Sequence, residues 1–262
     1  MVPILNYHEI CPLDTASNRL AVTPQAFAAQ LEYLVEQGFT TFTASAIAAA
    51  LATGGPLPAR PVVLTFDDGF ADFHERALPL LRQYGCTATL FVTTGWIADA
   101  KQRAAGPEPA RMLTWSQIVE AASDGIEIGA HSHTHPQLDQ LGRKKLRAEL
   151  IVSKKLLEDR LGTSVPGLAY PFGYSRLVVR RAAIEAGYVY ACAVANAMAS
   201  PKHDPLALPR LTIKASIDKE KFANAVGGRS LSKIYSIDHM LTKGWAVVRR
   251  TKAIVTGVPA RA

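Results

Sequence analysis

Two groups of polar residues in this sequence have the types and spacing of a catalytic metal site. Asp67 and Asp68 are adjacent, and His131 and His135 are four residues apart. On one helical turn the two imidazoles would face the same way and could bind one ion, with Asp68 as an oxygen ligand. Such a ligand set leaves coordination positions open, and the second carboxylate can take a proton from activated water. We expect His133, between the ligands, to point elsewhere.

Each group alone has an ordinary explanation. An Asp-Asp-Gly sequence after a strand is commonly a turn, and a histidine-rich segment is commonly a polar loop. However, His8, Asp67 to Gly69, His131 to His135 and Tyr170 to Gly173 each follow a different expected strand. Because the carboxyl ends of parallel strands converge on one rim, these groups should meet in one site.

The elements that must position these groups form a repeated strand, loop, helix and glycine pattern, which predicts a parallel α/β fold. Seven apolar or β-branched runs are expected strands: 2–7, 61–66, 87–93, 126–130, 167–170, 188–194 and 208–213. A polar, helix-breaking insertion at 98–111 predicts a surface loop. The length of 262 residues lies within the range of a single α/β barrel.

The net charge of +7 lies entirely in the last part of the chain. From residue 219 onward there are nine Lys and Arg residues and two acidic residues, so 1–218 is neutral overall. Ile237, Leu241 and Trp245 recur there at helical spacing, so this basic tail either makes peripheral contact with an anionic membrane or packs on the body. No nucleic-acid-binding module is recognisable, so nucleic acid is not an expected partner.

Cysteine usage and the N-terminal sequence indicate a compartment. Cys11, Cys86 and Cys192 are far apart and lie outside any metal or redox spacing, which predicts reduced packing residues. The sequence contains neither a signal-peptide pattern nor an apolar run long enough to span a bilayer. We therefore expect a cytoplasmic protein, with peripheral membrane contact through the tail as the alternative to packing of the tail on the body.

Two motifs carry a resemblance to a known family. Thr65-Phe66-Asp67-Asp68-Gly69 and His131-Ser132-x-x-His135-Pro136 resemble the first two motifs of the polysaccharide deacetylase family, carbohydrate esterase family 4. The similarity continues through 113–115 and 125–130 and covers about 1–213. It implies a distorted (β/α)7 barrel of the NodB type, with a catalytic domain at 1–218 and a basic C-terminal helical extension at 219–262.

The resemblance also implies roles for the site residues. Asp67 corresponds to the general base, and Asp68, His131 and His135 correspond to the ligands of a divalent metal. Zinc is the expected metal, with cobalt and nickel as alternatives. Ser132 is expected to support the ligands.

The third family motif is altered in this chain. Its place is taken by Ala169-Tyr170-Pro171-Phe172-Gly173, in which the Phe172 N–H can help to bind an oxyanion and Tyr170 and Pro171 are expected to contact substrate. Ala169 replaces the arginine that steadies the base in the family. Either Arg210 substitutes from a neighbouring strand or the base is less constrained, and we also place Arg210 among the expected substrate-binding residues.

The late Leu-x-His motif that supplies the family's general acid is missing. Asn6-Tyr7-His8-Glu9-Ile10 resembles the opening of the poly-N-acetylglucosamine deacetylase branch, in which an early histidine has that role, so His8 is the expected acid. The implied reaction is removal of the N-acetyl group from an N-acetylhexosamine-containing glycan, with release of acetate. The alternatives are an O-acetyl esterase and a catalytically silent carbohydrate-binding relative.

Overall fold

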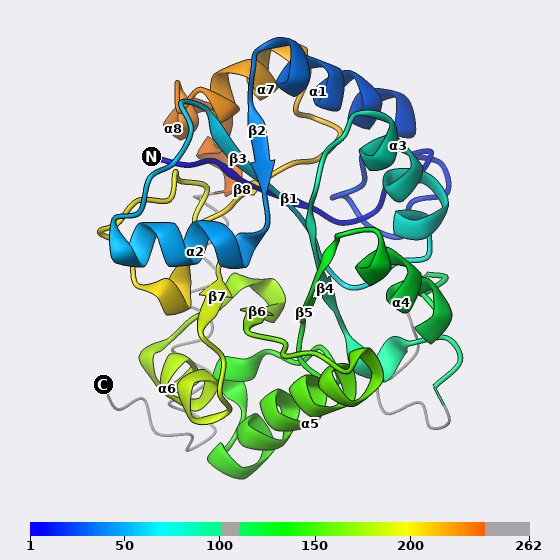
Figure 1. The fold of residues 1–262 in the computed structure, drawn as a ribbon, viewed down its shortest axis with the longest axis vertical. Coiled ribbons are helices and arrows are strands. Elements are labelled where there is room, and N and C mark those ends of the chain that lie inside the picture. The colour runs from blue at the N-terminus through cyan, green and yellow to red at the C-terminus, as the bar shows by residue number, and fades with distance from the viewer. Residues whose placement is uncertain (101–109, 239–262) are drawn as a thin grey trace.

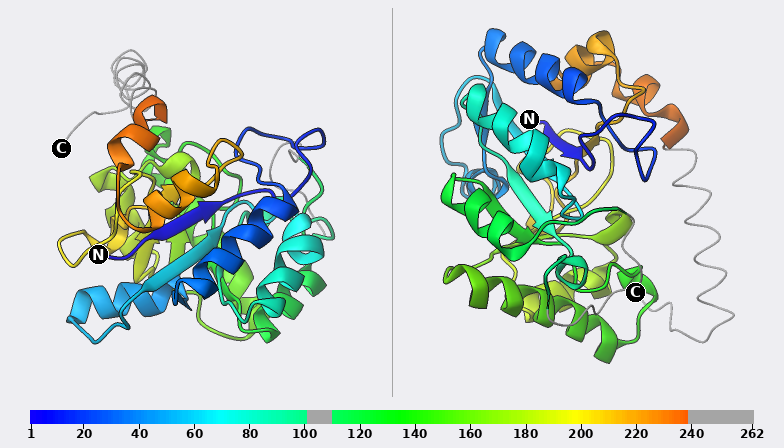
Figure 2. Two further views of the ribbon diagram at one scale, coloured as in Figure 1. Left: turned by 90° about the horizontal axis from the view of Figure 1, so that it is seen from above. Right: turned by 90° about the vertical axis from the view of Figure 1, so that its right-hand side faces the viewer.

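The computed structural model describes residues 1–100 and 110–238 of the chain. The strands are β1 (Ile4–Tyr7), β2 (Thr40–Phe42), β3 (Pro61–Phe66), β4 (Thr89–Val92), β5 (Glu127–Ala130), β6 (Gly167–Ala169), β7 (Tyr190–Cys192) and β8 (Leu211–Thr212). The α-helices are α1 (Pro24–Glu36), α2 (Ala44–Thr53), α3 (Leu78–Gln83), α4 (Trp115–Ser123), α5 (Arg143–Leu161), α6 (Leu177–Glu185), α7 (Lys219–Val226) and α8 (Leu231–Ile234). Helices surround the strands on the outside (Figures 1 and 2).

All strand pairs are parallel, in the order β7-β6-β5-β4-β3-β1-β8, and β2 pairs separately with the first half of β3. A parallel bridge between Cys192 and Leu208 joins the end of β7 to the segment that precedes β8. The sheet therefore curls into a distorted barrel whose strands all end on one side, as expected from the sequence.

The seven expected strands are all present, although most are shorter at their ends. The sequence reading missed β2, because its three residues are partly exposed and show neither alternation nor a continuous buried run. In contrast, β3 is buried at every position, and its bounds agree with the expected 61–66.

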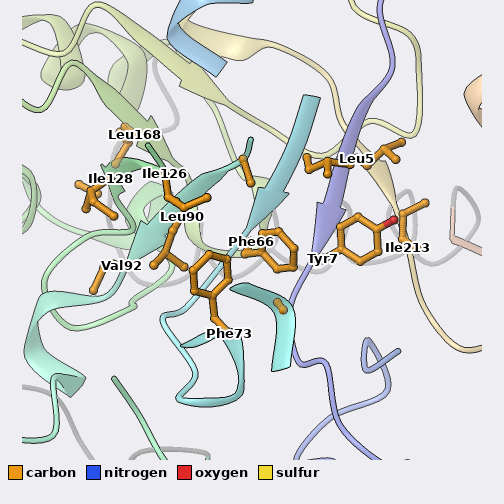
Figure 3. Close-up of a cluster of buried hydrophobic side chains, with 14 of the residues drawn as sticks. Leu5, Tyr7, Phe66, Phe73, Leu90, Val92, Ile126, Ile128, Leu168 and Ile213 are labelled. Carbon is orange, nitrogen blue, oxygen red and sulfur yellow. The ribbon is translucent and has the colours of Figure 1, made fainter. Parts of the chain in front are cut away.

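The core forms around the aromatic residues of β1 and β3. The Phe66 ring lies 4.9 Å from the ring of Phe73 and 5.3 Å from that of Tyr7 (Figure 3). All three side chains are almost completely buried, and aromatic pairs at such distances contribute beyond the area that they bury. The last residues of β1 and β3 are thus held by packing directly before the polar residues that follow them.

The beginning of the expected C-terminal extension packs on the body. Phe222 of α7 is buried and contacts Tyr33 of α1, with ring centroids 6.0 Å apart, and Tyr235 is also buried. The division at residue 218 remains a prediction. Residues 239–262, on which the membrane-contact prediction mainly rests, and 101–109 of the expected surface loop lie outside the described residues.

Two further sequence predictions concern the cysteines and membrane spans. All three cysteines are free thiols, with Cys11 and Cys192 buried and Cys86 half-buried, in agreement with a packing role. Among the described residues, no helix has the length and apolar character needed to cross a membrane.

Candidate active site

A cavity of about 600 Å³ opens where the strands end. Its lining includes most of the residues that the sequence singled out: His8, Asp67, Asp68, His131, His135, Tyr170 and Phe172. The prediction that these groups meet on one rim is therefore confirmed.

The first aspartate is held by a buried arginine. Arg210 donates from Nη1 to Asp67 Oδ1 and from Nη2 to Asp67 Oδ2, both at 2.7 Å. Arg210 is completely buried, and its Nη1 and Nε also donate to Thr65 Oγ1 and the Ala193 carbonyl. A planar guanidinium matches a carboxylate in this two-point geometry and fixes its orientation. Arg210 thus holds Asp67 as the third-motif arginine would, in a chain that has Ala169 at that motif position. Its expected contact with substrate was wrong, because Arg210 does not line the cavity.

Further contacts orient Asp67, and the charges around it keep it ionised. Its backbone N–H donates to the Tyr7 carbonyl at 3.0 Å, and the Asn6 amide nitrogen donates to Asp67 Oδ2 at 3.2 Å. Burial acts to raise the pKa of this carboxyl group, but the charge and hydrogen bonds of Arg210 together with the nearby His131 and His8 outweigh burial, so the pKa lies below its usual value. Asp67 therefore stays ionised and keeps one orientation.

The second aspartate has no such partner. Asp68 Oδ1 is buried and accepts no well-oriented hydrogen bond among the described residues. The Nε2 atoms of His131 and His135 face it at 3.4 and 3.2 Å. His131 Nδ1 is 2.9 Å from the Ala169 carbonyl and donates to it, and burial lowers the pKa of this imidazole to about 4. The neutral ring therefore turns the lone pair of Nε2 toward Asp68.

A carboxylate oxygen and an imidazole lone pair that face each other need a cation between them. The three candidate ligand atoms all lie within 4.8 Å of one another, as in the donor set of a single ion. Two nitrogens and one oxygen match the ligands of catalytic zinc, and the second ring nitrogen of His131 is fixed by a carbonyl, as is usual for metal-binding histidines. These residues fit the divalent metal that the sequence predicted.

The loop that carries the histidines differs from the sequence expectation. Residues 131–137 form no helical turn, so the reason given for the four-residue spacing was wrong although the two histidines do meet. Ser132 and His135 have left-handed φ values of 63° and 55°, and Ser132 Oγ accepts the His135 N–H at 3.0 Å. His133 points away from the metal site, as predicted, and lies 2.8 Å from Thr94 Oγ1.

A carboxylate from α5 secures this loop. Glu149 Oε2 accepts the backbone N–H groups of His133 at 2.9 Å and Thr134 at 2.7 Å, and Glu149 Oε1 accepts the Thr134 hydroxyl at 2.6 Å. These hydrogen bonds offset the energetic cost of the left-handed residues in the loop and fix the positions of the two metal-facing imidazoles.

The third motif borders the cavity beside His135. Phe172 is 51% exposed, has a φ of 60°, and packs its ring 4.8 Å from the His135 ring. Gly173 must be glycine, because a Cβ there would approach the Val194 backbone nitrogen at 2.8 Å. Tyr170 lines the cavity while its hydroxyl donates to the Leu206 carbonyl, but Pro171 is buried outside the lining, so its expected substrate contact was wrong.

The candidate acid, His8, follows β1 and lies in the cavity lining, half-buried. Its Nδ1 is buried and has no hydrogen-bond partner within the described residues. The ring shares the cavity with Asp67 and Asp68, as a proton donor to a leaving group would require.

Three contributors escaped the sequence reading: Asn6, Glu149 and Asn196. Asn6 is the first residue of the Asn6 to Ile10 motif, but no role was assigned to it. Glu149 lies in a helical sequence without a distinctive motif, and Asn196 lies in the irregular segment after β7. The structure shows a shared signal, since five of the six described non-glycine residues with left-handed φ values belong to this site: Asp68, Ser132, His135, Phe172 and Asn196. Clustering of such conformations is typical of functional sites.

Comparison with known proteins agrees with this geometry. Residues 54–191, just over half of the chain, match the family model described as polysaccharide deacetylase. The chain belongs to this family. The matched segment contains Asp67, Asp68, both metal-facing histidines and the Pro171-Phe172-Gly173 turn of the polysaccharide deacetylase site.

The relatives include solved and curated deacetylases. The structure of the Streptococcus pyogenes deacetylase PplD in complex with acetate is 29% identical, with a TM-score of 0.76, over 86% of this chain and 97% of that one. YxkH of Bacillus subtilis, assigned as a polysaccharide deacetylase, is 28% identical over 84% of this chain and 74% of its own. The poly-beta-1,6-N-acetyl-D-glucosamine N-deacetylase of Escherichia coli is 30% identical over 135 residues, which are 49% of this chain but only 20% of that enzyme.

Proposed function

We propose that this polysaccharide deacetylase is a metal-dependent hydrolase that removes the N-acetyl group from N-acetylhexosamine units of a glycan and releases acetate. The observation that carries the proposal is the pair of adjacent carboxylates with opposite surroundings. Asp67 is clamped by Arg210, while Asp68 faces two imidazole nitrogens without a hydrogen bond. The similarity to a poly-N-acetylglucosamine deacetylase supports the same substrate class.

Asp68, His131 and His135 would hold the metal, for which zinc is the first candidate and cobalt and nickel are alternatives. When bound, such a cation would polarise the acetamide carbonyl and lower the pKa of an adjacent water molecule. The role of these three side chains is to place the reacting acetamide beside Asp67.

Asp67 acts as the base in this proposal. Its low pKa keeps it ionised over the working pH range, and the clamp from Arg210 fixes the direction of its free lone pairs. It removes a proton from the attacking water as the carbon–oxygen bond forms. The Phe172 N–H helps to stabilise the resulting oxyanion.

The amine leaving group needs a proton when the carbon–nitrogen bond breaks. His8 lies in the same cavity and can donate that proton as an imidazolium ion. The products are acetate and the free amino sugar. Arg210 takes no part in proton transfer, because its guanidinium remains charged.

The test is acetate release from N-acetylglucosamine oligomers by metal-stripped protein, with and without added zinc or cobalt. We expect release only with metal, and loss of at least 10³-fold in Asp67→Asn, on the order of a lost general base. Xylan carrying O-acetyl groups serves as the parallel substrate. Release from xylan alone, or near wild-type turnover by Asp67→Asn with metal bound, would overturn the proposal.

A further inference from the structure

Asn196 lies in the catalytic cavity but has no role in the proposed reaction. It follows β7, is 6% exposed, and has a left-handed φ of 49°. Its backbone N–H donates to the Arg210 carbonyl at 2.9 Å. The residue is therefore tied to the backbone of the arginine that holds Asp67.

The orientation of the Asn196 side chain follows from a second contact. The Thr212 backbone N–H donates to Asn196 Oδ1 at 2.9 Å, which identifies that atom as the oxygen. The amide nitrogen, Nδ2, makes no hydrogen bond within the described residues and is not among their enclosed polar atoms. Because the residue lines the cavity, its two N–H donors open toward the space that substrate would fill.

The neighbouring residues complete a polar wall. Asn6 of β1 and Thr212 of β8 are aligned across the parallel pair, and both line the cavity next to Asn196. The amide nitrogen of Asn6 is committed to Asp67 Oδ2. Asn196 Nδ2 is thus the amide donor of this wall that remains available to a ligand.

The partners of the lining carboxylates indicate what that donor would meet. Arg210 pairs with Asp67, and Lys214 pairs with Asp238 at 2.6 Å. Asp68 faces the two imidazoles of the proposed metal site. A hydroxyl oxygen of a sugar can accept a hydrogen bond from an amide N–H. The acetamido group itself must lie at Asp67 and Asp68, which leaves the ring hydroxyls for Asn196.

We propose that Asn196 Nδ2 donates a hydrogen bond to a ring hydroxyl of the N-acetylated sugar and thereby favours substrates that carry this hydroxyl. This inference rests on the proposed function. Asn196 is a specificity-determining residue in this account, because a site with an oriented amide donor binds a sugar that lacks the matching hydroxyl less well.

The test compares N-acetylglucosamine oligomers with analogues that each lack one ring hydroxyl, using wild type, Asn196→Asp and Asn196→Gly. The aspartate keeps the oxygen that accepts from Thr212 but removes the donors. The glycine keeps the left-handed backbone at little cost. Asn224→Ala, a change at a half-buried position of α7 outside the cavity lining, is the matched control for loss of an asparagine.

We expect one deoxy analogue to lower kcat/KM about tenfold with wild type and the control, and to cause no further loss with either Asn196 variant. A purely structural role, or the added charge of the aspartate, would reduce activity on all substrates by the same factor. Such proportional losses in both variants would overturn the inference while the proposed function stands. Absence of acetate release from every parent oligomer by metal-loaded wild type would instead overturn the proposed function, and the inference with it.

Discussion

Asp67 and Asp68 are neighbours in the sequence, yet their surroundings in the structure differ in almost every respect. Asp67 is paired at both oxygens with the buried guanidinium of Arg210, which directly precedes β8. Asp68 has a left-handed φ of 73°, and its Oδ1 faces imidazole nitrogens without a hydrogen bond. The chain itself supplies the cation for the first carboxylate, whereas the second is open to a cation from solution. In the proposed function, this difference separates the base from the metal ligand.

The largest expected effect comes from breaking the internal pair. Arg210→Met leaves Asp67 buried without its counter-charge, so we expect a loss of about 3–5 kcal/mol in the free energy of unfolding, measured by urea denaturation. Arg180→Met, which breaks the partly exposed pair with Asp204, is the matched control and should cost less than about 1 kcal/mol. Equal losses of unfolding free energy in the two variants would show that the buried Arg210–Asp67 pair contributes no more to stability than a partly exposed pair.

Metal addition should stabilise the other side of the site. Zinc at about 100 times its Kd should raise the free energy of unfolding of the wild type by about 2.7 kcal/mol, because it binds only the folded ligand set. His131→Ala should lose this gain, while His133→Ala, on the same loop, should retain most of it. Thermal unfolding with and without zinc measures both changes. If only His133→Ala lost the stabilisation by zinc, the metal would not be bound by His131.

A smaller effect is expected from the support of the histidine loop. Glu149→Gln keeps the size of the side chain but removes one acceptor oxygen and the charge that three hydrogen bonds use. We expect zinc affinity to fall by about 10- to 100-fold, measured by competition with a chromogenic chelator. Asp159→Asn, on the exposed face of the same helix, is the control. Unchanged affinity in Glu149→Gln would mean that the loop holds its conformation without α5.

A third carboxylate, Asp72, extends the comparison, because its ionisation should make the stability of the protein depend on pH. Burial and the nearby Glu9 raise the pKa of Asp72 to about 7, so the folded protein binds its proton more tightly than the unfolded chain does. The stability from that proton is complete below about pH 4 and is lost as the pH rises through 7. Asp72→Asn should therefore be more stable than wild type by at least about 1 kcal/mol at pH 8, with little difference at pH 4. Thermal unfolding across this range measures the gain, and an equal gain at both pH values would contradict this origin.

The features that depend on local sequence patterns could be predicted from the sequence. The continuous apolar run 61–66 located β3, and the two motifs after β3 and β5 located the candidate metal ligands. The spacing of His131 and His135 was informative although the helical reason for it was wrong, because left-handed residues achieve the same convergence.

The sequence did not suffice where partners are distant along the chain. Arg210 lies 143 residues from Asp67, and only the arrangement of β8, β1 and β3 brings them together. The sequence offered Arg210 as a substitute for the missing arginine only as one of two alternatives, and placing it also among the substrate contacts was wrong, as it was for Pro171. Glu149 and Asn196 act through backbone hydrogen bonds, which leave no signature in a single sequence.

The most direct test of the account is zinc stoichiometry and affinity in Asp67→Asn and Asp68→Asn, two adjacent, nearly isosteric neutralisations. We expect Asp67→Asn to bind one zinc ion per chain with an affinity close to that of the wild type and to release no acetate, while Asp68→Asn loses roughly 100-fold or more in zinc affinity. Loss of zinc from Asp67→Asn together with its retention by Asp68→Asn would contradict the division of roles between the two carboxylates.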